Sequence, residues 1–185
     1  MGVAASPASG TPAEGARVTL EGLFLMHADY VWNSLRRLGV PEADVEDLTH
    51  EVFLQVHARL DDYDPARAAK PWLFAFAFRI ASQYRRRAHR RYETHGEPDV
   101  ARDPAPAADE RLEADDERRL VLAALDAIDL DRRAVFVLFE IDRVPMDRIA
   151  ASLGVPVNTA YSRLRVARDE FRAAVRRIRL RRGEP

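Results

Sequence analysis

The chain has 185 residues, of which 47% are hydrophobic and 32% are charged, with a formal net charge of -1 and no cysteine. This composition supports packed cores in one medium domain or two small ones, and it excludes a wholly disordered chain. The lack of cysteine excludes disulfides and thiolate metal sites and fits a reducing cytoplasm. The longest apolar run, around residues 72–78, is far shorter than the ~20 residues that a membrane-spanning helix needs.

The near-neutral total conceals separate acidic and basic segments. Residues 42–64 carry eight acids against one arginine, and residues 93–117 carry ten acids against two arginines. Residues 79–92 carry six arginines and no acid, and residues 161–182 carry nine arginines and two acids. Each basic segment is either a surface that binds polyanions locally or a solvated helix face.

Residues 1–18 are predicted to be a disordered tail. They are rich in Ala, Ser, Pro and Gly, lack a periodic apolar face, and do not have the pattern of a signal peptide. Apolar residues at helical spacing predict the first helix over residues 20–38. Gly39 ends this helix, and Pro41 opens a second that runs to about residue 60.

The second helix separates an apolar stripe from an acidic side. Its inner stripe consists of Val45, Leu48, Val52, Val56 and Leu60. Another side carries Asp44, Asp47, Glu51 and Gln55. Acids in the first turn suit the helix dipole, but Glu51 lies beyond that turn. This acidic ridge is therefore a candidate docking face for a basic partner.

A turn-rich connector over residues 61–70 leads to a third helix, which begins at Pro71 and ends in an arginine tract. Trp72, Leu73 and Phe76 are predicted to be core residues. Phe74 and Phe78 are either core residues as well or, beside the arginines, a stacking platform for unpaired bases.

Three prolines among acids and alanines predict a linker over residues 94–111, between all-helical domains at 19–93 and 112–182. The second domain is expected to begin with a helix over residues 115–128. Asp131 is then expected to cap a helix over residues 131–141. No strand alternation is evident anywhere in the sequence, which predicts an all-α protein.

Residues 145–168 have the pattern of a helix-turn-helix. Gly154 is expected to stop the first helix by taking the left-handed conformation, and Pro156 to open the second. The small Ala150, four residues before Gly154, lets the two helices pack closely. The apolar stripe of the second helix consists of Val157, Ala160, Leu164 and Ala167. A second helix of this kind lies in the DNA major groove with its N-terminal residues at base edges.

With these segments placed, the chain resembles the extracytoplasmic-function (ECF) group of the sigma-70 family of bacterial transcription initiation factors over about residues 20–179. The N-terminal half is similar to sigma region 2 in the stretches PEADVEDLTHEVFLQV, DDYDPAR and PWLFAFAFRIASQYRRR. The C-terminal half is similar to sigma region 4 between ALDAIDLDRR and NTAYSRLRVAR. The implied fold is all-α: a three-helix region 2-like domain and a helix-turn-helix region 4-like domain, joined by a flexible linker.

The resemblance implies roles for individual residues. It implies that core polymerase is bound by Asp47, His50, Glu51 and Gln55, where His50 departs from the usual glutamine. It implies contacts with the -10 element by Asp62, Tyr63, Asp64, Arg67, Ser82, Gln83 and Arg86, the first four in a loop that receives a flipped base. It implies that the -35 element is read by Asn158, Thr159, Tyr161, Ser162, Arg163, Arg165 and Arg168.

The implied protein binds core RNA polymerase at the clamp helices of the largest subunit and the flap region, reads promoter DNA and helps to open it. An anti-sigma factor is a further implied partner, so the expected location is the cytoplasm, either free or held at the membrane by that partner. No cofactor, metal, catalytic residue or small-molecule substrate is implied. The two promoter elements lie about 25 base pairs, or ~85 Å, apart, so the extended linker must contribute to an open arrangement.

Two other interpretations compete with the sigma factor. A stand-alone helix-turn-helix regulator would bind duplex DNA without polymerase, but it leaves the acidic second helix and the aromatic, arginine-rich third helix unexplained. An enzyme is disfavoured because the histidines at positions 27, 50, 57, 89 and 95 form no convincing metal-ligand pair. The sequence also has no phosphate-binding glycine loop and no nucleophile motif.

Overall fold

The computed structural model describes residues 18–95 and 111–183, and every regular element within those ranges is helical. The all-α prediction is therefore confirmed. The predicted tail, up to residue 17, and residues 96–110 of the predicted linker lie outside the described residues.

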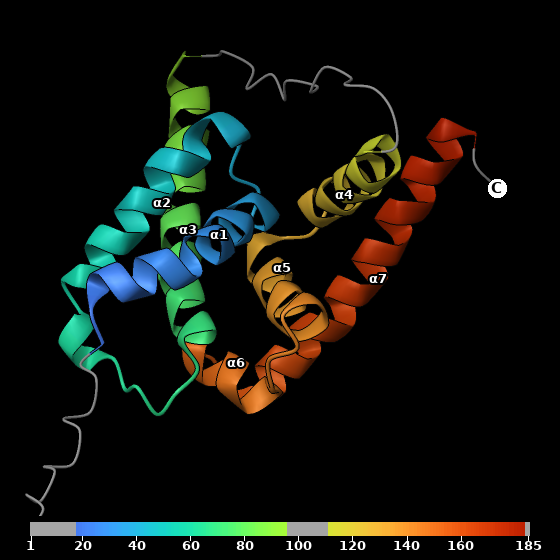
Figure 1. Ribbon diagram of the computed structural model, residues 1–185. Coiled ribbons are helices and arrows are strands. Elements are labelled where there is room, and N and C mark those ends of the chain that lie inside the picture. Colours follow the sequence, from blue (N-terminus) through green and yellow to red (C-terminus); the bar gives the residue numbers. More distant parts are fainter. Residues whose placement is uncertain (1–17, 96–110, 184–185) are drawn as a thin grey trace, which may run out of the picture.

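The N-terminal half contains α1 (Leu20–Arg37), α2 (Glu42–His57) and α3 (Ala69–His95), with a short 3-10 turn at Leu60–Asp62 (Figure 1). Gly39 has a φ of 89° directly after α1, as the sequence predicted. α2 ends earlier than expected, because the chain turns into the 3-10 segment. α3 begins two residues before Pro71, since a proline fits within the first turn of a helix, where its missing N–H is not needed.

The C-terminal half contains α4 (Arg111–Asp126), α5 (Leu130–Phe136), α6 (Met146–Leu153) and α7 (Val157–Arg182) (Figure 1). The predicted cap at Asp131 is wrong: Asp129 precedes α5, and its carboxylate accepts the N–H of Asp131. The predicted helix over 131–141 is helical in the structure, although only its first part, in α5, is an α-helix. It widens into a π turn at Val137–Ile141, where the N–H of Asp142 donates to the carbonyl of Val137.

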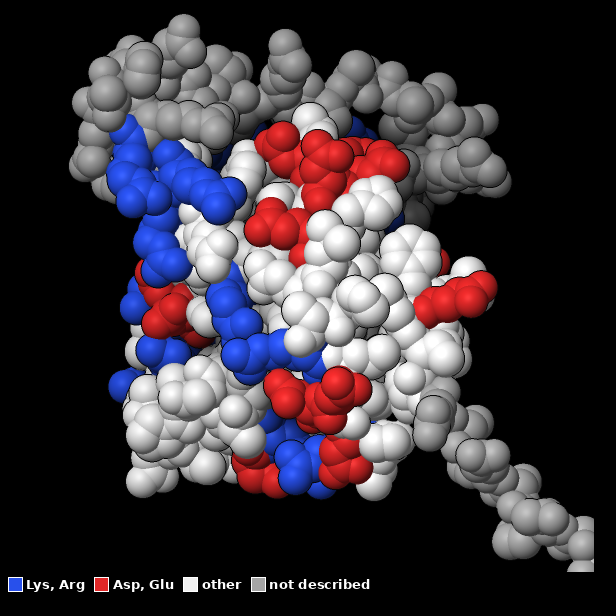
Figure 2. All heavy atoms as spheres, turned by 90° about the vertical axis from the view of Figure 1, so that its left-hand side faces the viewer, with Lys and Arg blue, Asp and Glu red and all other residues white. Residues whose placement is uncertain are grey.

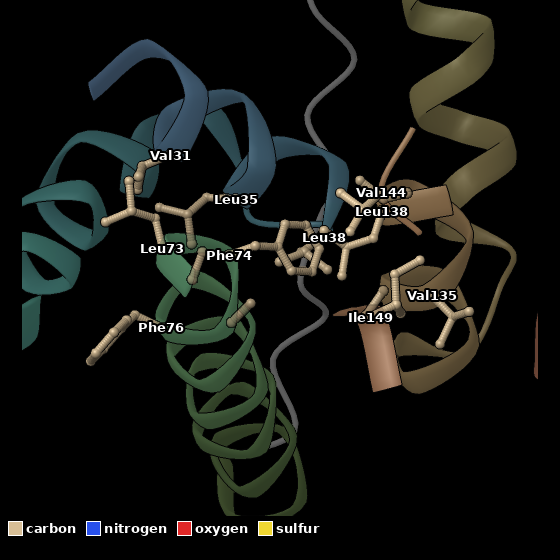
Figure 3. Close-up of a cluster of buried hydrophobic side chains, with 14 of the residues drawn as sticks. Val31, Leu35, Leu38, Leu73, Phe74, Phe76, Val135, Leu138, Val144 and Ile149 are labelled. Carbon is tan, nitrogen blue, oxygen red and sulfur yellow. The ribbon is translucent and has the colours of Figure 1, made fainter. Parts of the chain in front are cut away.

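The two halves are packed against each other in one hydrophobic cluster. Leu38 and Phe74 from the N-terminal half meet Leu138 and Val144 from the C-terminal half (Figure 3). Phe74 is fully buried, so a base-stacking role for it is wrong, whereas Phe78 is partly buried against the cluster. α6 lies against α3, and α4 lies against α1. The described helices thus form a closed arrangement.

Polar contacts accompany this apolar packing. The hydroxyl of Tyr30 donates to the Asp142 carboxylate at 2.7 Å, and Arg37 donates to the same carboxylate at 3.2 Å. The Asp142 side chain is only 6% exposed. Burial raises the pKa of Asp142, and the Tyr30 hydrogen bond and the Arg37 charge partly oppose that rise. From α6, the Ser152 hydroxyl donates to the carbonyl of Pro71.

A buried arginine fills the space beside the end of α1. Arg133 is 1% exposed, pairs with Asp126 at 2.7 Å, and donates to the carbonyl of Ile128 at 3.0 Å. A Cβ atom at Gly39 would collide with the Arg133 guanidinium and approach the Asp126 carboxylate. Glycine therefore suits this position in two ways: it adopts the positive φ without strain, and its lack of a Cβ atom leaves room for the Arg133 guanidinium.

The Tyr30–Asp142 contact predicts a pH dependence of stability. Burial, followed by the Asp142 charge, raises the pKa of Tyr30 above its ordinary value. A raised pKa keeps the folded phenol protonated, so the stability that it contributes is complete below about pH 10 and declines as the pH rises above that value. We expect the difference in unfolding free energy between the wild type and Tyr30→Phe to shrink between pH 8 and pH 11 in urea titrations. An unchanged difference across that interval would contradict the contact.

Candidate nucleic-acid and protein interfaces

α6 and α7 form the predicted helix-turn-helix. Gly154 takes the left-handed conformation with a φ of 67°, and the N–H of Val155 donates to the carbonyl of Ala150 at 3.0 Å. Ala150 is 2% exposed, which allows the close approach of the helices that its size predicted. α7 buries Ala160, Leu164 and Ala167 against the domain. This packing fixes which side of α7 faces outward.

The outward side of the N-terminal part of α7 is polar. Its exposed residues are Asn158, Tyr161, Ser162 and Arg165, and Thr159 is partly buried. Val157, predicted to belong to the apolar stripe, is 42% exposed, because it is the first residue of the helix and precedes the packed stretch. Arg165 makes no ion pair with any described residue. An amide, a phenol, a hydroxyl and a guanidinium on one surface can bond to base edges and phosphates.

Two of the arginines predicted to read DNA are engaged within the protein. Arg163 pairs with Asp131 at 2.7 Å. Arg168 pairs with Glu140 at 2.6 Å and lies over the ring of Phe139 at 5.5 Å. These contacts hold α7 against α5 and the π turn. The structure therefore brings the predicted residues onto one helix but divides them into exposed groups and bracing groups.

The acidic ridge of α2 is divided in the same way. Asp47 and His50 are exposed, while Glu51 and Gln55 are partly buried. The His50 ring stacks against Phe24, with centroids 6.5 Å apart and planes 15° apart. Asp44 accepts a 2.6 Å hydrogen bond from Tyr84 of α3, so it joins two helices. On the face of the molecule seen in Figure 2, one group of acidic side chains lies near the top, whereas acidic and basic side chains lie side by side lower down.

The connector between α2 and α3 presents both charged and aromatic groups. Asp62, Asp64 and Arg67 are exposed. Tyr63 packs on Trp72, with ring centroids 4.7 Å apart, and its hydroxyl donates to the carbonyl of Arg67 at 3.0 Å. Burial, followed by the charge of Asp64, raises the pKa of Tyr63. The connector is thus anchored to the start of α3 by an aromatic contact.

Farther along α3, the predicted -10 residues differ in accessibility. Arg86 is exposed, whereas Ser82 and Gln83 are partly buried. The Ser82 hydroxyl donates to the carbonyl of Phe78 at 2.7 Å, so its hydrogen is already used. Arg79, which the sequence did not single out, is exposed and lies over the ring of Phe76 at 5.4 Å. The sequence could have indicated Arg79 as a candidate, because it lies in the arginine tract one turn before Ser82 and Gln83.

Comparisons with known proteins match each half of the chain to a region of the sigma-70 family. Residues 23–92 match the model of Sigma-70 region 2, and residues 118–170 match the model of Sigma-70, region 4. The ECF RNA polymerase sigma factor SigE of Mycolicibacterium smegmatis is 33% identical over 169 residues, which are 88% of this chain and 63% of that relative. The RNA polymerase sigma factor CnrH of Cupriavidus metallidurans is 31% identical over 180 residues, 92% of this chain and 91% of that relative. The chain belongs to the ECF group of the sigma-70 family.

Solved structures of ECF sigma factors share this fold. The structure of CnrH in complex with the cytosolic domain of CnrY has a TM-score of 0.60 and 26% identity, and the match covers 83% of this chain and 85% of that one. The sigma factor RpoE in complex with the anti-sigma factor NepR from Bartonella quintana has a TM-score of 0.65 and 20% identity, covering 84% and 96%. The second likeness bears on the fold alone.

Sigma factors are not catalytic enzymes, and this chain acts with RNA polymerase in transcription initiation. Among the described residues, no group of three or more His, Asp or Glu side chains could hold a metal ion. No helix in the described part of the chain is both long and apolar enough to cross a membrane.

Proposed function

We propose that this ECF sigma factor binds core RNA polymerase through the acidic side of α2 and recruits it to promoters by contacting the -10 and -35 elements with separate surfaces. The observation that carries the proposal is that one chain combines a partly exposed acidic ridge, with Asp47 at the surface, and a separate exposed polar face on a helix-turn-helix. A stand-alone regulator of duplex DNA has no use for the acidic ridge.

The polymerase surface consists of Asp47, His50, Glu51 and Gln55. Charge complementarity with a basic helical partner, here the clamp helices of the largest subunit, would orient the encounter. His50, whose ring lies nearly parallel to that of Phe24, presents ring nitrogens at the place where the family usually has a glutamine amide. Either side chain can form a hydrogen bond at that position.

The -10 surface consists of the connector residues Asp62, Tyr63, Asp64 and Arg67 with Ser82, Gln83 and Arg86 of α3. Extracting a base from the duplex costs a few kcal/mol. Pocket contacts with the extracted base and arginine contacts with the strand's phosphates offset that cost. The Tyr63–Trp72 contact supports this role, because it fixes the connector before the strand arrives.

The -35 surface is the outward side of α7. Asn158, Tyr161, Ser162 and Arg165 contact DNA in the groove, where one good bidentate base contact contributes ~1–3 kcal/mol of discrimination. Arg163 and Arg168 position the helix while they are paired. Such surface pairs contribute only about 0–1 kcal/mol, so either arginine can exchange its carboxylate for a phosphate at little cost.

An anti-sigma factor is the remaining proposed partner. CnrH, whose solved structure is 26% identical to this chain, is seen in complex with the cytosolic domain of CnrY. We place the activity of this sigma factor in the cytoplasm, where it is either free or held at the membrane by such a partner. The flap region of the polymerase is the expected contact of the C-terminal half.

Run-off transcription tests the proposal as a whole. Core RNA polymerase is incubated with the purified full-length chain on a library of promoter fragments. We expect specific transcripts only when the chain is present. If the chain instead binds particular duplexes tightly in gel shifts without polymerase and supports no initiation, the stand-alone regulator replaces this proposal.

The docking surface predicts the effect of a charge reversal. Asp47→Lys combined with Glu51→Lys should abolish pull-down of core polymerase, because like charges would meet at the contact. Asp116→Lys combined with Glu117→Lys makes the same charge change at exposed positions of α4 and should leave pull-down intact. Circular dichroism checks that both variants remain folded. Equal retention of polymerase by the two variants would refute the assigned face.

The difference between the paired and the unpaired arginines of α7 predicts how strongly their substitutions weaken -35 recognition. Arg165→Ala should reduce -35 discrimination by about 1–3 kcal/mol and leave -10 discrimination unchanged, because the unpaired guanidinium is lost from the outward face. Arg163→Ala should also weaken -35 recognition more than -10 recognition, but by less than Arg165→Ala. Transcription from promoters altered at one element at a time measures both effects. Equal losses at the two elements would count against the assignment.

A further inference from the structure

We propose that Val157, the first residue of α7, reads the 5-methyl group of a thymine in the -35 element. The inference rests on the proposed function, because it adds one apolar contact to the polar contacts assigned to the outward side of α7. It gives a role to a side chain that the sequence predicted to be part of the buried stripe and that the structure leaves exposed.

The rotation of α7 places Val157 at the edge of its outward side. Ala160, Leu164 and Ala167 are buried, and their packing fixes which way the helix faces. At about 100° per residue, Tyr161 lies about 40° around the helix from Val157 on the outward side, and Ala160 lies about 60° away on the buried side. Val157 therefore lies where the outward side meets the packed side, and it is 42% exposed.

Val157 belongs to a small apolar group at the start of α7. Pro156 is exposed directly before it, and Tyr161, four residues later, is 55% exposed. Side chains four residues apart are neighbours on a helix. A single exposed apolar side chain is common on protein surfaces, but a group of them on a surface proposed to bind a partner indicates a contact that forms only in the complex.

The apolar group that DNA offers in its major groove is the C5-methyl of thymine. The other base edges in that groove are distinguished by hydrogen-bond donors and acceptors, which Asn158, Ser162 and Arg165 can bind. The Val157 side chain has no hydrogen-bonding atom, so it contributes to binding by removing methyl groups from water. Because the first residues of a recognition helix meet base edges, thymine is the base that matches Val157.

The valine side is rigid before the DNA arrives. A β-branched valine in a helix keeps one χ1 rotamer in about 90% of cases. The backbone before it is also fixed, since Pro156 has a φ of -59° and Gly154 ends α6 in the left-handed conformation. Little conformational entropy is therefore lost when the valine methyl groups meet the base.

Uracil in place of thymine tests the contact, because the two bases differ only in the methyl group. The holoenzyme is formed from core polymerase and the full-length chain, and the probe is a duplex promoter found in the run-off assay. Each thymine of the -35 element, on either strand, is replaced in turn by uracil, and the apparent Kd is measured. We expect one position at which uracil weakens wild-type binding about fourfold, the factor that corresponds to one methyl-sized apolar group.

Two variants assign that effect to a side chain. Val157→Ala should bind the thymine and uracil probes equally at the sensitive position, and its affinity should match that of the wild type on uracil. Leu180→Ala removes an exposed aliphatic side chain from the other end of α7 and should keep the wild-type response. Circular dichroism checks that both variants are folded. Equal sensitivity to uracil in Val157→Ala and the wild type would overturn the contact.

A second pair of probes separates the methyl group from the identity of the base. Cytosine, paired with guanine, is placed at the sensitive position and compared with 5-methylcytosine. The wild type should bind the methylated probe about fourfold more tightly, and Val157→Ala should not distinguish the two. A response to uracil without a response to 5-methylcytosine would assign the effect to the shape of the duplex and overturn the contact.

The outcomes separate this contact from the proposed function. If no thymine is sensitive to uracil, the contact is overturned, while run-off transcription by the wild type still supports the proposed function. If the wild type supports no run-off transcription, the same scan is made on a duplex that the chain binds alone in gel shifts. Sensitivity that Val157→Ala abolishes there supports the contact although the proposed function has failed, and a chain that binds no DNA in either assay overturns both.

Discussion

Burial of apolar side chains from both halves into one continuous cluster determines where the functional surfaces of this sigma factor lie. α3 contributes Phe74 to this cluster, and the loop before α6 contributes Val144. Because these groups must face each other, the arginine-bearing side of α3 and the polar side of α7 are left facing outward. The surfaces proposed to bind nucleic acid therefore consist of the polar sides of α3 and α7 that stay exposed when their apolar sides are buried.

Helical periodicity and turn chemistry were enough to predict most of the fold. Gly39 and Gly154 both adopt the left-handed conformation that their positions indicated, and the buried Ala150 permits the predicted close packing of α6 on α7. Boundaries were less accurate, as the cap at Asp129 shows, because neighbouring aspartates offer equivalent caps. The π turn could not be predicted, since its stability depends on tertiary contacts of Asp142 and Val144 rather than on local propensity.

The sequence predicted which residues form the candidate site, but not which of their side chains are exposed and which are paired within the protein. A sequence pattern gives the side of α7 on which Arg163 and Arg165 lie, but not that Arg163 meets Asp131, 32 positions earlier. The sequence also did not indicate that the Arg133 side chain is buried. A charged side chain is expected outside, and its burial depends on a carboxylate and a carbonyl that come together only in the folded chain.

The close approach of Gly39 and Arg133 makes the residue at position 39 in one half sterically dependent on the residue at position 133 in the other. A side chain at residue 39, or a bulkier group facing it from the other half, would have to displace the Arg133 guanidinium before the halves could pack as they do here. Chimeras built from this chain should therefore preserve residues 39 and 133 as a compatible pair.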